Sequence, residues 1–199
     1  MSRIPVPQPG DHAPIAGPHD VSLRPIAEGD LDMLLRWQRE PEVAHWWDEA
    51  DLSREEMRRE YLEPDIAPTW RFVIEWEGRD VGMVQYWHKY PDTDDLWSAG
   101  IDILIGEADA RDRGVGREAI RVLLRYLFEV KRLHRVTIDP EVANVRAIRA
   151  YERAGFTRDG VLRHEYQIRG EYVDTQYLSI LETDWPEAKR VWLEERASR

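Results

Sequence analysis

The chain has 199 residues, of which 42% are hydrophobic and 34% charged, and its formal net charge is -11. This length and composition predict one globular domain without a membrane span, and the lack of cysteine excludes disulfides, thiolate metal sites and an acyl-cysteine intermediate. The acidic charge argues against a nucleic-acid partner, which would need clustered Lys and Arg. It suits a cationic substrate, although acidic surfaces also simply keep proteins in solution.

Residues 1–20 are rich in Pro, Gly and His and show no hydrophobic periodicity. Such a segment buries too little surface to offset its ordering entropy, so we predict a disordered tail before a single domain over residues 21–199. The segment also lacks the apolar core of a signal peptide, which predicts a cytoplasmic protein.

Hydrophobic periodicity and turn signals predict the elements of the domain in chain order. The first half contains a strand at 21–26, a helix from Asp30, a short helix opened by a Ser53–Glu56 capping box, and three antiparallel strands at 70–76, 81–89 and 97–105. The second half contains a helix from near Gly114, a strand at 135–138, a helix at 144–154 ended by Gly155, a hairpin at 161–168 and 172–181, and a helix from Asp184. This order predicts a mixed α/β fold, with helices on the faces of a mixed sheet.

The strongest local signal is the segment Arg-Asp-Arg-Gly-Val-Gly at residues 111–116, between a predicted strand and a predicted helix. Glycine permits close approach to the backbone, and the amides at a helix start converge with the positive end of the helix dipole. The segment is neither a Walker loop nor a dinucleotide-binding turn. Taken alone, it fits a tight turn as well as a phosphate site.

A second motif follows about thirty residues later, with Asn144 at a predicted helix start and Tyr-Glu-x-x-Gly-Phe at residues 151–156. Together the two motifs resemble the GNAT superfamily of acetyltransferases, whose cofactor motif is Arg or Gln, two residues, Gly, one residue, then Gly or Ala. The resemblance implies a GNAT-type mixed sheet of about seven strands, splayed between strands 4 and 5 and flanked by helices. It also implies acetyl-CoA as the cosubstrate.

Within the superfamily, residues 21–156 are similar to aminoglycoside 6'-N-acetyltransferases. The similarity rests on the Trp46–Trp47 pair, Gly-Ile-Asp at 100–102 and Ile-Asp-Pro at 138–140. It implies direct acetyl transfer to the 6'-amine of an aminoglycoside, an antibiotic-resistance activity. Two alternatives remain open: N-acetylation of another amine (a protein N-terminus, a polyamine or a siderophore precursor), and a non-catalytic CoA-binding module.

The resemblance also implies the residues of the cofactor site: Ile103, Leu104, Ile105, Arg111, Arg113, Gly114, Val115, Gly116, Arg117, Asn144 and Tyr151. Asn144 and Tyr151 are two helical turns apart, so both can face one groove. The Tyr151 phenol could protonate the departing CoA thiolate; the alternative is that it only packs against the cofactor.

The implied substrate residues are Trp46, Trp47, Asp94, Asp95, Asp102 and Asp139. Asp102 is expected to be the catalytic base, with a substrate anchor as the alternative, and Asp139 either binds the amine or only caps the turn before Pro140. For the two tryptophans, read as neighbours on one helix, we expect one wall of the site and one core residue.

The acidic loop with Asp92, Asp94 and Asp95 is shorter than the loop of the resembling enzymes, which leaves amino-sugar specificity open. The six histidines show no metal-ligand spacing, so no metal is expected.

Overall fold

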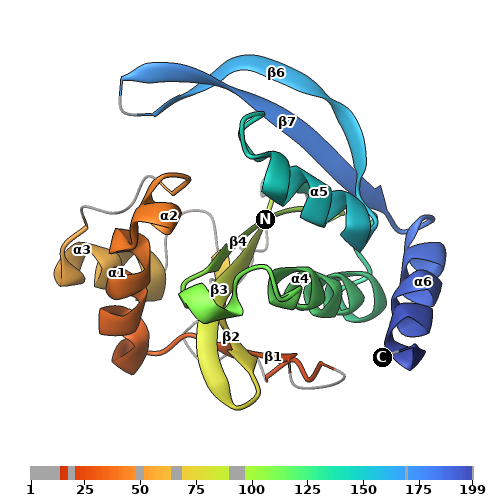
Figure 1. Cartoon of the computed structure of the whole chain (residues 1–199), viewed down its shortest axis with the longest axis horizontal. Helices are drawn as coiled ribbons and strands as arrows, with labels where there is room; N and C mark the ends of the chain where they lie inside the picture. Colours follow the sequence, from red (N-terminus) through yellow and green to blue (C-terminus); the bar gives the residue numbers. More distant parts are fainter. Residues whose placement is uncertain are drawn as a thin grey trace, which may run out of the picture.

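The computed structural model describes residues 14–17, 21–47, 52–63, 69–89, 97–168 and 170–198. Its centre is a seven-stranded sheet in the order β1-β2-β3-β4-β5-β7-β6 (Figure 1). The strands are β1 (Val21–Pro25), β2 (Thr69–Trp76), β3 (Arg79–His88), β4 (Ser98–Ile105), β5 (Arg135–Ile138), β6 (Thr157–Ile168) and β7 (Glu171–Leu181). Only β4 and β5 run parallel; the other neighbours are antiparallel. The mixed sheet expected from the sequence is confirmed.

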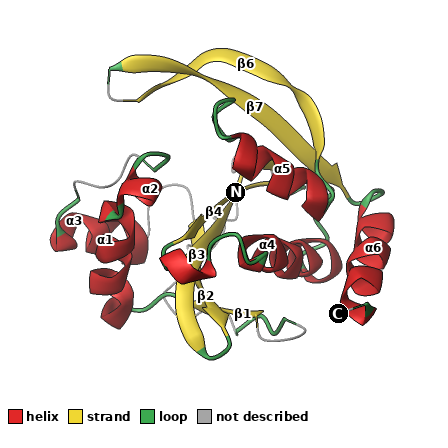
Figure 2. Ribbon diagram, in the orientation of Figure 1, coloured by secondary structure: helices red, strands yellow, loops and turns green. Residues whose placement is uncertain are grey.

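Helices lie on both sides of this sheet, as Figure 2 shows. They are α1 (Leu31–Arg39), α2 (Pro41–Ala44), α3 (Arg54–Leu62), α4 (Val115–Arg125), α5 (Val145–Ala154) and α6 (Trp185–Ala197), and a π-helical turn (Tyr126–Val130) extends α4. None of the described helices is both long and apolar enough to cross a bilayer. The short helix α2 has no counterpart among the predicted elements, because four residues opened by Pro41 give no measurable periodicity.

Two hydrophobic clusters cover the two faces of the sheet. On β2, Phe72 and Ile74 belong to the cluster that includes α4, α5 and α6, whereas Val73 belongs to the cluster with α1 and α3. Successive side chains of a strand point to opposite faces, so this alternation shows that β2 is buried on both sides. The two layers of helices thus hold the strands between them.

The sheet opens between β4 and β5. Their pairing covers only Ser98 to Gly100 against Arg135 to Thr137, and β5 ends at Ile138 while β4 continues to Ile105. Within the described strands, residues 101–105 therefore have β3 on one side and no strand on the other. This confirms the splay between strands 4 and 5, and it leaves backbone polar groups along one edge of β4 for a ligand.

The segment before β1 packs more closely than the sequence suggested. Ile15 exchanges backbone hydrogen bonds with Leu23 at 2.7 and 3.1 Å, and its side chain is only 8% exposed. Ile15 therefore packs beside β1, a contact that the composition of residues 1–20 did not predict. Residues 1–13 and 18–20 of the expected tail lie outside the described residues.

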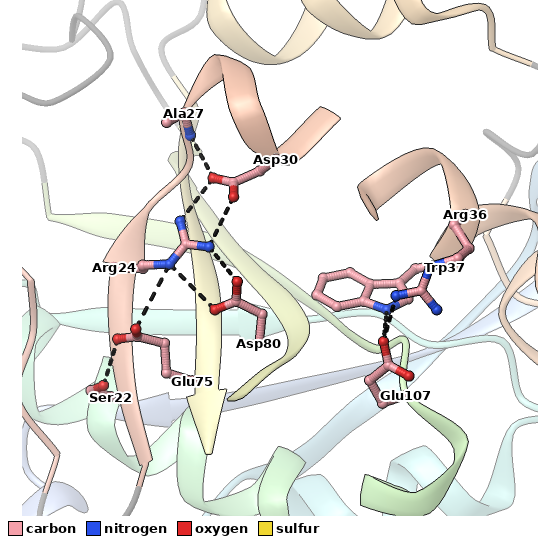
Figure 3. Close-up of polar contacts among 9 residues, drawn as sticks. All are labelled: Ser22, Arg24, Ala27, Asp30, Arg36, Trp37, Glu75, Asp80 and Glu107. Atoms are coloured by element: carbon pink, nitrogen blue, oxygen red, sulfur yellow. Dashed lines mark hydrogen bonds and ion pairs between the residues drawn. The ribbon is translucent and has the colours of Figure 1, made fainter. Parts of the chain in front are cut away.

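Two polar networks fix the first helix against the sheet (Figure 3). The Arg24 guanidinium donates to both oxygens of Asp30 at 2.8 Å and to Asp80 at 2.7 Å. Burial opposes the charge on Asp30, but hydrogen bonds from Arg24 and the Ala27 amide outweigh it and hold the pKa of this carboxyl below its ordinary value. Arg24 thus joins β1, the start of α1 and β3.

The second network reaches the loop that follows β4. The Trp37 indole N–H donates to Glu107 at 2.8 Å, and Arg36 donates to the same carboxylate oxygen at 2.6 Å. Because Glu107 lies two residues beyond the end of β4, these bonds couple α1 to the segment that leads into α4.

We predict that Arg24→Met lowers the free energy of unfolding by about 2 to 3 kcal/mol at neutral pH, because it leaves two partly buried carboxylates without their charged donor. The Asp30 carboxylate stabilises the fold at pH values above the pKa that it has in the unfolded chain. This contribution is lost as the pH falls through its lower pKa in the folded protein. The deficit of the variant should therefore shrink below about pH 4. Urea unfolding across pH measures this, with Arg190→Met on the exposed surface of α6 as the control. A deficit that stays constant down to acid pH would contradict the assignment.

Candidate active site

The start of α4 exposes backbone amides in a loop of unusual conformation. Gly114 is the N-cap residue, with φ 82° in the left-handed region, and Asp112 also has a positive φ of 58°. The first N–H groups of a helix have no acceptor within the helix, and they carry the positive end of its dipole. This loop therefore presents a cluster of donors suited to an anion.

Gly116, in the first turn of α4, faces the open edge of β4. A Cβ atom built at Gly116 would lie 3.5 Å from Ile105 Cγ1 and 3.8 Å from Ile103 Cδ1, which are ordinary contact distances. The packing of the chain itself thus tolerates a side chain here. Glycine instead leaves the amides of this turn accessible from the cleft in front of them.

A cleft of about 740 Å³ lies in front of this loop, between the open edge of β4, α2 and α5. Its lining includes Ile103 to Ile105, the loop 110–117, Asn144 and Tyr151, so the structure brings the predicted cofactor residues together. Six arginines line it, against two acidic residues, Glu42 and Asp112; the arginines are Arg111, Arg113, Arg117, Arg146, Arg149 and Arg153. In a chain with a net charge of -11, this concentration of arginine suits an anionic ligand.

The Arg111 side chain contacts the end of β4 and α2. Its guanidinium donates to the backbone oxygens of Ile105 at 3.0 Å and Gly106 at 2.8 Å, and it forms an ion pair with Glu42. These contacts tie the loop to the end of β4 and to α2. The Arg111 guanidinium is thus engaged by other parts of the protein.

Helix α5 supplies the opposite wall of the cleft. Asn144 is its N-cap residue and accepts a hydrogen bond from the Ala147 amide at 3.1 Å, while Gly155, with φ 115°, ends the helix in the left-handed conformation. Both helix boundaries were predicted from the sequence. The cap occupies the Asn144 carbonyl oxygen and leaves its side-chain amide group as a donor for a ligand.

Tyr151 lies where the strands separate and is only 8% exposed. Burial raises the pKa of its phenol, and the negative charges of Asp102 and Asp139 raise it further. The phenol therefore stays protonated at neutral pH and presents its hydroxyl as a hydrogen-bond donor. Both carboxylates act electrostatically on this one side chain.

Asp102 and Asp139 define what we call the carboxylate face, together with Gln85, Trp87 and Lys89 of β3. Gln85 donates to Asp102 at 3.2 Å, and side chains at alternate positions of β3 share that face. Sequence reasoning missed these three residues. They alternate along β3 with Val84, Tyr86 and His88, which are buried on the opposite face.

The hairpin of β6 and β7 arches toward this side of the molecule (Figure 1). From β6, Tyr166 donates its hydroxyl hydrogen to Asp139 at 2.9 Å. Asp139 is thus held by a hairpin residue rather than by the turn before Pro140, which disfavours a purely capping role. Tyr166 was also missed, since nothing local in the sequence connects it with Asp139.

Trp46 and Trp47 both line the cleft, but they do not lie on a helix. Helix α2 ends at Ala44, and the Trp46 ring packs edge-on against His45 with ring centres 4.3 Å apart. The premise that they are helical neighbours is therefore wrong. Trp47 also packs against the core cluster of α1 and α3, so this one residue both lines the cleft and contributes to the core.

Asp92, Asp94 and Asp95 of the acidic loop lie outside the described residues. Across the part of the chain that is described, no three His, Asp or Glu side chains gather as a metal site would require.

Comparison with known proteins agrees with this geometry. Residues 27–163 match the model of the acetyltransferase (GNAT) domain. An aminoglycoside N(6')-acetyltransferase type 1 of Klebsiella pneumoniae is 30% identical over 153 residues, covering 71% of this chain and 76% of that protein.

Two solved structures have the same fold. An aminoglycoside acetyltransferase in complex with coenzyme A and kanamycin is 25% identical, with a TM-score of 0.74 and coverage of 85% of this chain and 99% of that chain. A spermidine N-acetyltransferase from Vibrio cholerae in complex with CoA and spermine is 27% identical, with a TM-score of 0.73 and coverage of 83% and 98%.

Proposed function

The chain belongs to the GNAT acetyltransferase family, and we propose that it transfers the acetyl group of acetyl-CoA to a primary amine of a small cationic molecule, the 6'-amine of an aminoglycoside in particular. One arrangement supports the proposal. Tyr151 lines the arginine-rich cleft in front of the glycine loop, and its phenol also interacts electrostatically with the Asp102 and Asp139 carboxylates.

Acetyl-CoA would lie in the arginine-lined cleft. Its pyrophosphate would accept hydrogen bonds from the amides of Arg113 to Gly116, with the arginine side chains adding positive charge. The pantetheine arm would pair with the open edge of β4 at Ile103 to Ile105. This path leads the thioester to Tyr151.

The chemistry requires one proton acceptor and one proton donor. An amine with a pKa above neutrality arrives as ammonium and must lose a proton before its nitrogen can attack the acetyl carbonyl carbon. Asp102 would accept that proton, directly or through a water molecule. When the carbon–sulfur bond breaks, Tyr151 would protonate the CoA thiolate, and the acetylated amine leaves without a covalent enzyme intermediate.

The relatives support a cationic acceptor. One is named for aminoglycoside acetylation and another is crystallised with spermine, so a polyamine is the second candidate. Both are polycations, and Asp139 with its neighbour Asp102 would attract either. Acetylation of an aminoglycoside would confer antibiotic resistance, and the reaction would take place in the cytoplasm, where acetyl-CoA is made and used.

We predict that Gly116→Val weakens CoA binding by about 10- to 100-fold, which corresponds to about 1 to 3 kcal/mol, because the side chain would cover the amides of the first turn. Isothermal titration with CoA measures the effect. Gly160→Val, at an open position on β6 with nothing within 4 Å, is the matched control and should bind CoA normally. Gly114 is a poorer test, since its positive φ strains any substitution. Unchanged affinity in a folded Gly116→Val protein would refute the cofactor placement.

The proposed function is tested by following CoA thiol release from acetyl-CoA in the presence of kanamycin, spermidine and short peptides. The wild-type protein should turn over at least one of these amines. Asp102→Asn should lower kcat by about 10²- to 10⁴-fold, because the base is lost. Asp139→Asn should mainly raise KM for the amine, because it removes an anchor.

The control is Asp32→Asn on the exposed surface of α1, which should leave both constants unchanged. CoA binding serves as the check on folding, since neither aspartate lines the cofactor cleft. The proposed acceptor site is wrong if none of the tested amines makes the wild type release thiol. It is also wrong if both aspartate variants keep wild-type kinetics.

A further inference from the structure

Trp87 of β3 covers part of strand β4 on the carboxylate face. The indole of Trp87 packs directly on the backbone of β4: a Cβ atom at Gly100 would lie 2.4 Å from Trp87 Cζ2. Gly100 therefore makes room for the ring, and Gln85 beside it binds Asp102 on the same face. A half-buried indole next to a proton-accepting carboxylate is a surface on which an acceptor ring or methylene chain can rest.

Lys89 brings a positive charge to the same face. Its ammonium donates to Thr137 Oγ1 at 3.3 Å and to the Tyr177 hydroxyl, and it lies 4.2 Å from the centre of the Tyr177 ring. Thr137 lies in β5, and Asp139 directly follows Ile138, the last residue of this strand. The Lys89 ammonium thus contacts β5 two residues before Asp139, the carboxylate to which Tyr166 donates.

This charge has no counter-ion in the described part of the chain, where no carboxylate comes within ion-pair distance of Lys89. A partly buried ammonium repels another ammonium that approaches it. It also carries only donors, so it favours a ligand group with oxygen lone pairs. The carboxylate face therefore carries the Asp102 carboxylate beside Gln85 of β3, and a positively charged hydrogen-bond donor, Lys89, four residues further along the chain.

We propose that Lys89 selects acceptors that carry an oxygen, a hydroxyl or a carboxylate, near the reacting amine, and that it disfavours linear polyamines. The amine nitrogen lies at Asp102 and Asp139, the body of the acceptor rests on Trp87, and the oxygen accepts a hydrogen bond from the Lys89 ammonium. This inference rests on the proposed function and narrows its substrate class.

The test compares kcat/KM for three amines, kanamycin, lysine and spermidine, in the wild type and in Lys89→Met, by thiol release from acetyl-CoA. Kanamycin offers hydroxyls, lysine offers a carboxylate and spermidine offers no oxygen. Lys89→Met should reduce kcat/KM for the preferred oxygen-bearing amine, relative to kcat/KM for spermidine, by about tenfold or more. The reduction should come chiefly from a higher KM for the oxygen-bearing amine. If kcat/KM falls more for kanamycin, the oxygen that Lys89 binds is a hydroxyl; if it falls more for lysine, the oxygen belongs to a carboxylate.

Lys89→Arg should keep most of the preference, because it retains charge and donors. Lys131→Met is the matched control, since Lys131 is an exposed lysine over the Tyr126 ring and away from the carboxylate face. A wild type that acetylates at least one amine while Lys89→Met leaves the ratios within twofold would overturn the role of Lys89 alone. A wild type that acetylates none of the amines would overturn the proposed function, and this inference with it.

Discussion

The opening of the sheet between β4 and β5 is the constraint on which the rest of this molecule depends. Three residue pairs hold the two strands together, and then β5 stops while β4 runs on. An unpaired strand edge inside a domain is costly unless something satisfies its backbone groups. In this fold the edge faces a cleft, so its polar groups are open to a ligand. In the proposed function, this opening would let a cofactor in the cleft meet an acceptor at the two aspartates.

Charge is divided across this opening. The protein as a whole is acidic, yet six arginines gather around the cleft on one side, and Asp102 and Asp139 lie toward the other. Tyr151 lies between them, with a pKa raised first by burial and then by both carboxylates. The arginines suit a phosphorylated cofactor, whereas the carboxylates suit an amine. Two partners of opposite charge can thus approach one another without competing for the same groups.

The elements that the sequence predicted are those with local causes. The Ser53–Glu56 capping box, the left-handed Gly155 and the apolar stripe of α4 each depend on residues within one or two helical turns, and each forms as expected. The loop at residues 111–116 was also predictable, because a glycine pattern before a helix is a local signal. Its six residues lie in the loop and first turn as predicted.

What the sequence could not predict depends on the path of the chain in space, and in most cases on contacts between distant segments. Arg111 turns to the carbonyls of Ile105 and Gly106, a choice set by the path of the loop in space. Tyr166 reaches Asp139 from a hairpin 27 residues away, and Lys89 reaches Tyr177 across 88 residues. Ile15 packs although its neighbours in sequence give no periodicity. These contacts depend on strand register and on the paths of the loops, which single-residue patterns do not encode.

A crystal structure of the protein with bound CoA would show most directly whether the opening between β4 and β5 holds the cofactor. We expect the pyrophosphate to accept hydrogen bonds from the amides at the start of α4, and the thiol to lie between β4 and β5 within hydrogen-bond distance of the Tyr151 hydroxyl. CoA bound away from the glycine loop, or a thiol that does not enter the opening between the two strands, would contradict it.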